Sequence, residues 1–141
     1  MPIRRMSPEA LSMGVFSTKS DVWAYGVLLW EIATLGSTPY VGMGAQEVIS
    51  YIRQGNICPR PEHCDSEFYE LMLSCWAYKA DDRLTFAEIR SKLQRLLLEM
   101  SENELNNNKS YIDLEHFNDS LYYFKTKVSL YLIGNFVHVD F

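Results

Sequence analysis

The sequence predicts a mainly helical protein with an irregular C-terminal tail. The strongest observation is the run from Val22 to Trp30, in which no residue is charged and all but Gly26 are apolar. A helix that is apolar all round must be buried on nearly every side. A second observation is a stripe of apolar residues, three to four positions apart, between residues 86 and 100. After Met100 the sequence turns polar and contains a run of asparagines, which ends the helical core.

The first two helices carry clear start and stop signals. A short helix begins at Ser7-Pro8-Glu9, where the serine can cap and the proline fits the first helical position, and it ends before Gly14. The long apolar helix is then capped by Thr18 or Ser20. Gly36 terminates it, since glycine tolerates the left-handed conformation that commonly follows a helix.

Three more helices are expected before the tail. The third spans about Ala45 to Arg53 and the fourth about Ser66 to Ala77, each with an apolar stripe along one face. A fifth begins at Thr85, because Thr85 and Glu88 form a capping box in which each side chain bonds the other residue's backbone N–H. The sequence therefore predicts five helices in the core.

The tail is expected to be less regular than the core. Ser101–Ser110 is polar and indicates a linker or a frayed helix end. Two runs of aromatic and β-branched residues, Leu121–Phe124 and Val128–Leu132, are compatible with strands. We therefore place one domain at residues 1–100, followed by a linker and tail of uncertain structure at 101–141.

Composition narrows the class of protein. The net charge of −5 and the lack of a basic stripe argue against a nucleic-acid partner. Cys58, Cys64 and Cys75 form no metal-binding spacing, so we expect reduced thiols in a cytoplasmic protein. No segment reaches the roughly 20 apolar residues of a membrane helix, so no membrane contact is expected within this chain.

Four segments, in the right order, resemble the C-terminal lobe of protein tyrosine kinases. They match the substrate loop with its following Ala-Pro-Glu-type helix, the buried central helix, the loop after it, and the end of the domain: Pro2–Glu9, Ser20–Glu31, Leu35–Tyr40, and Cys75-Trp76 with Asp82–Phe86. The match covers about Pro2 to Leu98. The resemblance implies the helical lower part of the kinase C-lobe, incomplete, with residues 1–100 as a partial kinase domain.

Two segments favour a particular branch of the family. Leu35–Tyr40 and the later Tyr111-Ile112-Asp113-Leu114 resemble receptor tyrosine kinases of the fibroblast-growth-factor-receptor-like group. That resemblance implies a parent protein that phosphorylates protein tyrosines in receptor signalling, with ATP and magnesium as cofactors. It also implies that this part of the parent lies on the cytoplasmic side of a membrane.

The resemblance assigns scaffold roles to three charged residues. Glu9 and Arg83 match a buried ion pair between the substrate-loop helix and the last connection of the lobe. Asp21 matches the acid that holds the catalytic loop through its backbone amides, since a carboxylate in an apolar setting needs donors or it would protonate. The alternative is that Asp21 only caps its helix and meets the helix dipole. Without a catalytic loop in this chain, Asp21 would lack its family partners.

Other positions match the substrate groove and the core. Pro2 and Met6 match positions that shape the groove beside the substrate residue, and a flexible methionine suits a shallow pocket. The alternative for both is core packing. The three tryptophans are expected to be core anchors rather than ligand sites: Trp23, Trp30 and Trp76.

Two residues depart from the family pattern. Arg5 stands where the family has tryptophan, so a charge replaces a flat packing surface and puts the substrate groove in doubt. Leu84 stands where the family has proline, and we expect it to loosen the turn before Thr85.

The motifs that handle phosphate are absent from the sequence. Phosphoryl transfer needs a glycine-rich loop, a lysine on the phosphates, an acid for the tyrosine proton, and magnesium ligands. No GxGxxG, Val-Ala-X-Lys, His-Arg-Asp or Asp-Phe-Gly occurs here. We therefore expect no catalytic, cofactor-binding or metal-binding residues in this chain, which is a kinase fragment that is inactive alone.

The alternative function is a non-catalytic helical binding module. It would engage protein partners through the substrate groove, or SH2-type domains through phosphorylated tail tyrosines. The candidate phosphotyrosines are Tyr111, Tyr122 and Tyr123. The alternative for these residues is unmodified aromatic side chains.

Overall fold

The computed structural model describes residues 2–107 as a set of helices, and this part of the chain contains no strand. Five α-helices and two 3-10 helices follow one another: η1 (Ile3–Arg5), α1 (Pro8–Met13), α2 (Thr18–Ala33), α3 (Ala45–Arg53), α4 (Ser66–Cys75), η2 (Ala80–Asp82) and α5 (Phe86–Asn107). The predicted mainly helical fold is therefore confirmed. None of the described helices is long and apolar enough to cross a membrane.

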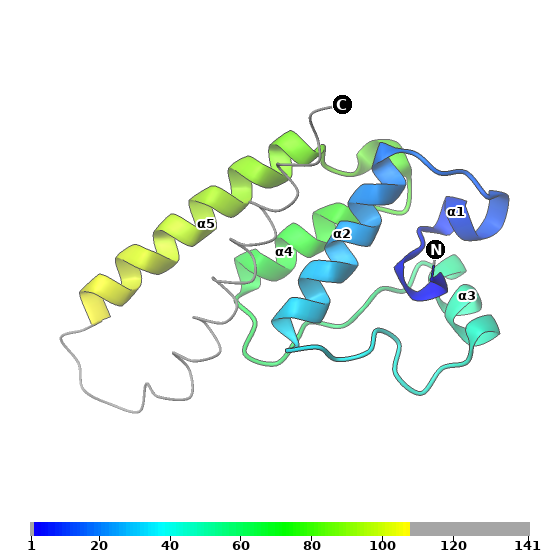
Figure 1. Cartoon of the computed structure of the whole chain (residues 1–141), viewed down its shortest axis with the longest axis horizontal. Helices are drawn as coiled ribbons and strands as arrows, with labels where there is room; N and C mark the ends of the chain where they lie inside the picture. Colours follow the sequence, from blue (N-terminus) through cyan, green and yellow to red (C-terminus); the bar gives the residue numbers. More distant parts are fainter. Residues whose placement is uncertain (1, 108–141) are drawn as a thin grey trace. The chain divides into compact units, whose positions relative to one another are not determined.

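The long apolar helix α2 forms the centre of the core. It packs along α4, and η1 and η2 also contact it; Figure 1 shows α2 and α4 lying side by side. Six of the nine residues in the predicted apolar run are buried: Val22, Trp23, Gly26, Val27, Leu29 and Trp30. Ala24, Tyr25 and Leu28 are only half-buried, so one face of α2 is less covered than the rest.

Gly26 allows α2 and the end of α4 to approach closely. A Cβ atom added at this position would lie 2.7 Å from Cys75 Cβ and 2.7 Å from Trp76 Nε1, closer than real Cβ contacts. A glycine inside an apolar helix is costly in isolation, but here it removes the one side chain that would separate the two helices. The one non-apolar position in the run is thus a packing requirement.

The three tryptophans are buried, as expected of core anchors. Trp23 and Trp76 are 1% and 4% exposed, and their ring centroids lie 6.5 Å apart. Trp30 is 7% exposed, and its indole N–H donates to the carbonyl of Pro59 at 2.7 Å. Large aromatic side chains contribute most of their stabilisation through such buried contact area.

The caps of the first two helices differ from the prediction. α2 is capped by Ser17, not by Thr18 or Ser20: the Ser17 hydroxyl accepts from the Ser20 N–H, and the Ser20 hydroxyl accepts from the Ser17 N–H. Ser20 therefore serves as the third helical residue of a reciprocal capping box, with serine in the place of the usual glutamate. α1 does follow Ser7, but the Ser7 hydroxyl makes no cap hydrogen bond.

The later helices match their predicted spans with two corrections. α4 ends at Cys75 rather than Ala77, and the carbonyls of Ala77 and Tyr78 accept hydrogen bonds from the Arg83 guanidinium in place of helical donors. The Thr85–Glu88 capping box is present at the start of α5. α5 continues to Asn107, across the boundary placed between residues 100 and 101, since the intervening residues include no proline or glycine to stop it.

The chain divides into two compact units, residues 1–94 and residues 95–141. All elements up to the first turns of α5 belong to the first unit. Of the second unit the structure describes the remaining turns of α5, where Arg95 and Glu99 form an ion pair one helical turn apart. The predicted strands and the candidate phosphotyrosines Tyr111, Tyr122 and Tyr123 lie outside the described residues.

Candidate functional site

The candidate site is the N-terminal segment, residues 2–9, in which the sequence predicts a substrate groove. A single 3-10 turn shapes its first half: the Arg5 N–H donates to the Pro2 carbonyl at 3.0 Å, and the Met6 N–H donates to the Ile3 carbonyl at 3.1 Å. Pro2 and Met6 therefore lie at the two ends of η1. Pro2 is exposed and Met6 is half-buried, so both remain accessible to a ligand.

Arg4 anchors this segment to the loop before α3. Its Nη1 donates to the carbonyls of Pro39 and Tyr40 at 2.7 and 2.8 Å, and its Nη2 donates to the Met43 carbonyl at 2.6 Å. Charge-assisted hydrogen bonds of this length are stronger than neutral ones. Sequence reasoning missed this anchor, because backbone carbonyls of a distant loop leave no signature in the sequence.

Arg5 pairs with α2. Its Nε and Nη2 donate to the two carboxylate oxygens of Glu31 at 3.2 and 3.0 Å. The Arg5 side chain is 46% exposed and that of Glu31 is 20% exposed. The charge that replaces the family's tryptophan is therefore held on the central helix, and does not stand unpaired beside Met6.

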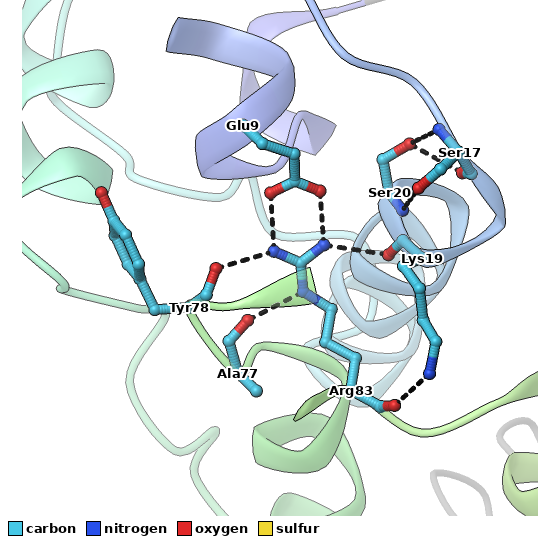
Figure 2. A network of polar contacts seen from close by, with 7 residues as sticks. All are labelled: Glu9, Ser17, Lys19, Ser20, Ala77, Tyr78 and Arg83. Atoms are coloured by element: carbon cyan, nitrogen blue, oxygen red, sulfur yellow. Dashed lines mark hydrogen bonds and ion pairs between the residues drawn. The ribbon is translucent and has the colours of Figure 1, made fainter. Parts of the chain in front are cut away.

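Glu9 pairs with Arg83, which lies 74 positions further along the chain (Figure 2). Arg83 Nη1 donates to Glu9 Oε1 at 2.6 Å, and Nη2 donates to Glu9 Oε2 at 2.8 Å. The Arg83 side chain is 0% exposed and the Glu9 side chain is 13% exposed. This two-pronged geometry suits the planar guanidinium, and it joins α1 to the connection between η2 and α5.

Arg83 also satisfies its remaining N–H groups on backbone carbonyls. Its Nε donates to Ala77, its Nη1 to Lys19 and its Nη2 to Tyr78, at 2.8, 3.0 and 3.1 Å. The Lys19 ammonium in turn donates to the Arg83 carbonyl. Figure 2 shows the acceptors of the Arg83 guanidinium, which come from α1, from α2 and from the segment after α4.

A buried guanidinium with every donor used is a rigid junction rather than a movable charge. It also lies over the ring of Trp23, 5.0 Å from the ring centroid, where a cation is attracted by the aromatic face. Arg83 thereby links the polar network to the core tryptophans.

The ion pair sets the protonation of Glu9. Burial alone would raise the pKa of the Glu9 carboxyl. The hydrogen bonds that Glu9 accepts and the positive charge of Arg83 lower the pKa, and their combined effect is larger than that of burial. The net effect lowers the pKa of Glu9 below its ordinary value of 4.5. Glu9 is therefore ionised throughout the neutral range, as the pair requires.

Asp21 lies in the first turn of α2 and is exposed. Its carboxylate is therefore not in the apolar setting of the family role, as expected where the catalytic-loop partners are absent, and that role stays a prediction for a longer kinase. Its position near the positive end of the helix dipole fits the alternative role, in which the acid stabilises the start of the helix.

Leu84, in the turn before Thr85, makes a contact that a proline could not make. Its N–H donates to the Ser74 carbonyl of α4 at 3.2 Å. A proline at this position has no N–H and could not make that bond. The leucine therefore exchanges the rigidity of proline for one additional link between the turn and α4.

Neither the sequence motifs nor the described side chains show a site for ATP or magnesium. The sequence lacks every phosphate-binding motif of kinases, and no group of three histidine, cysteine, aspartate or glutamate side chains in the described part could hold a metal ion. Burial raises the pKa of the Cys75 thiol to about 12 and that of Cys58 to about 11, so neither is a thiolate at neutral pH.

Comparison with known proteins agrees with this geometry. A family model described as protein tyrosine and serine/threonine kinase matches residues 1–93. The chain is 44% identical over 123 residues to tyrosine kinase receptor Cad96Ca of Drosophila melanogaster, covering 87% of this chain and 15% of that protein. It is 49% identical over 89 residues to an insulin-like peptide receptor of Branchiostoma lanceolatum, covering 63% of this chain and 6% of the receptor.

A third relative extends the same pattern. The chain is 45% identical over 94 residues to the insulin-like growth factor 1 receptor of Xenopus laevis, covering 67% of this chain and 7% of the receptor. The chain therefore belongs to the protein tyrosine and serine/threonine kinase family, and its relatives are receptor tyrosine kinases. It spans no more than 15% of the length of these relatives. Members of this family use ATP and magnesium.

Proposed function

We propose that this chain is the substrate-loop part of a receptor tyrosine kinase domain and does not transfer phosphate by itself. The observation that carries the proposal is the anchoring of residues 2–9 at three points. Arg4 ties the segment to the loop before α3, Arg5 ties it to α2, and Glu9 ties it to Arg83. A loop fixed in this way presents a defined surface to a peptide, as preorganised binding requires.

The chemistry of phosphoryl transfer must then come from other residues. Catalysis in kinases is mainly positioning of the phosphates and stabilisation of their charge. None of the motifs that perform these tasks occurs in the chain. In the proposed parent, the missing residues bind ATP and magnesium, the reaction phosphorylates protein tyrosines, and this part lies on the cytoplasmic side of the membrane.

Calorimetric titration with ATP and magnesium tests the proposed inactivity. We expect no saturable binding to the chain alone and no phosphate transfer to a tyrosine peptide. Saturable binding at micromolar nucleotide would overturn the proposal. An active kinase domain of the same family, titrated under the same conditions, serves as the positive control.

A second candidate function is a non-catalytic binding module. The same anchoring supports it, because a fixed segment with Pro2 and Met6 accessible can hold a peptide without any chemistry. The partners would be protein substrates, or SH2-type domains on Tyr111, Tyr122 or Tyr123 after phosphorylation. We expect no nucleic-acid partner and no membrane contact for this chain. Binding of tyrosine peptides that Met6→Asp weakens would favour this function, while the matched Leu73→Asp variant on α4 should leave it unchanged.

The narrower assignment to the fibroblast-growth-factor-receptor-like group is also part of the proposal. It rests on the resemblance of Leu35–Tyr40 and Tyr111–Leu114. The sequence encoded around this chain tests it: upstream His-Arg-Asp and Asp-Phe-Gly motifs would establish a longer kinase, and an ectodomain would identify its receptor group.

A further inference from the structure

Tyr78 presents its phenol ring on the surface of the folded core. It lies between α4 and η2, and 52% of the residue is exposed. Its hydroxyl donates to the Arg53 carbonyl at 3.4 Å, a long and weak contact. Figure 2 shows the ring extending away from the guanidinium of Arg83.

The backbone of Tyr78, in contrast, is fixed. Its carbonyl accepts from Arg83 Nη2 at 3.1 Å, and the preceding Ala77 carbonyl accepts from Arg83 Nε at 2.8 Å. The ring is therefore displayed from a fixed point, and an enzyme can reach its hydroxyl by displacing one weak hydrogen bond.

The other tyrosines of the described part are less accessible. Tyr40 is 7% exposed. The half-buried Tyr69 donates its hydroxyl to the Cys58 carbonyl at 2.7 Å. Tyr51, on α3, is half-buried and donates its hydroxyl to the Ile57 carbonyl at 3.4 Å. Tyr25 is half-buried and packs its ring on Phe86. Among the described tyrosines, Tyr78 alone combines an exposed ring with a weakly held hydroxyl.

Two basic residues neighbour Tyr78, one next to it in sequence and one through the contact of its hydroxyl. Lys79 follows it in sequence and is exposed. Arg53, whose carbonyl meets the Tyr78 hydroxyl, has an exposed side chain whose Nε donates to Ser12 Oγ at 3.1 Å. A phosphate dianion beside Arg and Lys gains charge-assisted hydrogen bonds.

We propose that Tyr78 is a phosphorylation site, modified in trans by a protein tyrosine kinase that carries the catalytic residues this chain lacks. The Tyr78 Oη forms a bond to the γ-phosphorus of magnesium-bound ATP. The bond from that phosphorus to the bridging oxygen breaks, ADP leaves, and the phenol proton passes to the catalytic base of the acting kinase. Nothing is oxidised or reduced.

The modification has a structural consequence. A phosphorylated oxygen has no hydrogen to donate, so the contact with the Arg53 carbonyl is lost. This one hydrogen bond between α3 and the segment after α4 is then lost, while the bonds from Arg83 to the backbone remain.

The experiment treats the full chain with an active tyrosine kinase domain, ATP and magnesium, and locates phosphate by fragment mass spectrometry. We expect early phosphate on Tyr78 to exceed that on Tyr69 roughly tenfold or more, because Tyr69 needs local opening to react. Tyr78→Phe should remove the signal, and the matched Tyr69→Phe should retain it.

Two results would overturn the proposal. One is an unmodified Tyr78 in a reaction where the same kinase labels a control peptide. The other is equal labelling of Tyr69 and Tyr78, which would mean that exposure in the fold does not select the site. Neither result bears on nucleotide binding by the chain itself, so this test is independent of the proposed function.

Discussion

Two arginine–glutamate pairs hold the N-terminal segment, and they differ in burial, in length and in the backbone carbonyls that the arginine also meets. Arg83 and Glu9 meet at 2.6 and 2.8 Å with the arginine side chain 0% exposed. Arg5 and Glu31 meet at 3.0 and 3.2 Å with the arginine side chain 46% exposed. Both are two-pronged contacts, so geometry alone does not separate them.

The comparison shows that burial and additional hydrogen-bond acceptors decide how much such a pair contributes to the free energy of unfolding. An exposed ion pair contributes about 0–1 kcal/mol, because water and salt screen it. Breaking a buried pair costs about 3–5 kcal/mol, because the remaining charge loses its partner in a poorly polarisable setting. Arg83 also donates to three backbone carbonyls, which Arg5 does not.

The largest effect is expected from breaking the buried pair. Glu9→Ala should lower the free energy of unfolding by about 3–5 kcal/mol, and Arg83→Ala should lower it further, because three carbonyls lose their donor as well. Urea unfolding of both variants and of the double variant measures this. We expect a coupling energy of about 0.5–3 kcal/mol between the two positions.

Simple additivity of the two losses would contradict the pairing. Since a domain has only about 5–15 kcal/mol of net stability, either alanine variant can unfold outright. Glu9→Gln and Arg83→Lys are milder changes that keep the side-chain volume and one hydrogen bond. Their double-mutant cycle measures the coupling energy between the two positions on protein that remains folded. Arg5→Ala is the matched control, and it should show no coupling to Glu9.

Lowering the pH should reduce the contribution of the buried pair to the stability of the folded chain. The pKa of Glu9 is lower in the folded chain than its ordinary 4.5, so ionised Glu9 contributes stability above that pH. This contribution is lost as the pH falls through the folded pKa. We expect the stability difference between the chain and its Glu9→Gln variant to shrink on acidification from about pH 6 to about pH 3.

Thermal unfolding at intervals across that range measures the difference. Parallel curves for the two proteins would mean that Glu9 does not titrate differently on folding, and that Arg83 does not lower its pKa. The same measurement on a Glu31→Gln variant gives the corresponding stability difference for the exposed pair, Arg5 and Glu31.

The smallest effect is expected from the exposed pair. Arg5→Ala should change the free energy of unfolding by about 1 kcal/mol or less. Raising the salt to about 1 M should remove most of that difference, since the screening length falls to about 3 Å. The cost of Glu9→Gln should respond to salt far less. A loss of several kcal/mol on Arg5→Ala would show that the arginine has taken over the packing role of the family's tryptophan.

The sequence was most informative where a single local signal sufficed. The apolar run at α2, the Thr85–Glu88 capping box and the span of α3 all depend on residues within one or two helical turns. The capping residue was not predicted correctly: three hydroxyl residues, Ser17, Thr18 and Ser20, lie at the start of α2, and only the fold shows that Ser17 caps while Ser20 completes the box. The pairing of Glu9 with Arg83 was predicted through resemblance to the family, because no local pattern links positions 74 residues apart.

The sequence by itself determined the helical class, the family and the absence of phosphate-binding motifs, because these depend on residue type and spacing. Only the tertiary structure decided which charges are buried and what they meet. Arg4, Arg5 and Arg83 are alike as residues, yet one binds loop carbonyls, one binds a half-buried carboxylate while staying exposed itself, and one is fully enclosed. Their differences arise from solvent exclusion and from backbone acceptors contributed by distant segments, and neither is encoded locally.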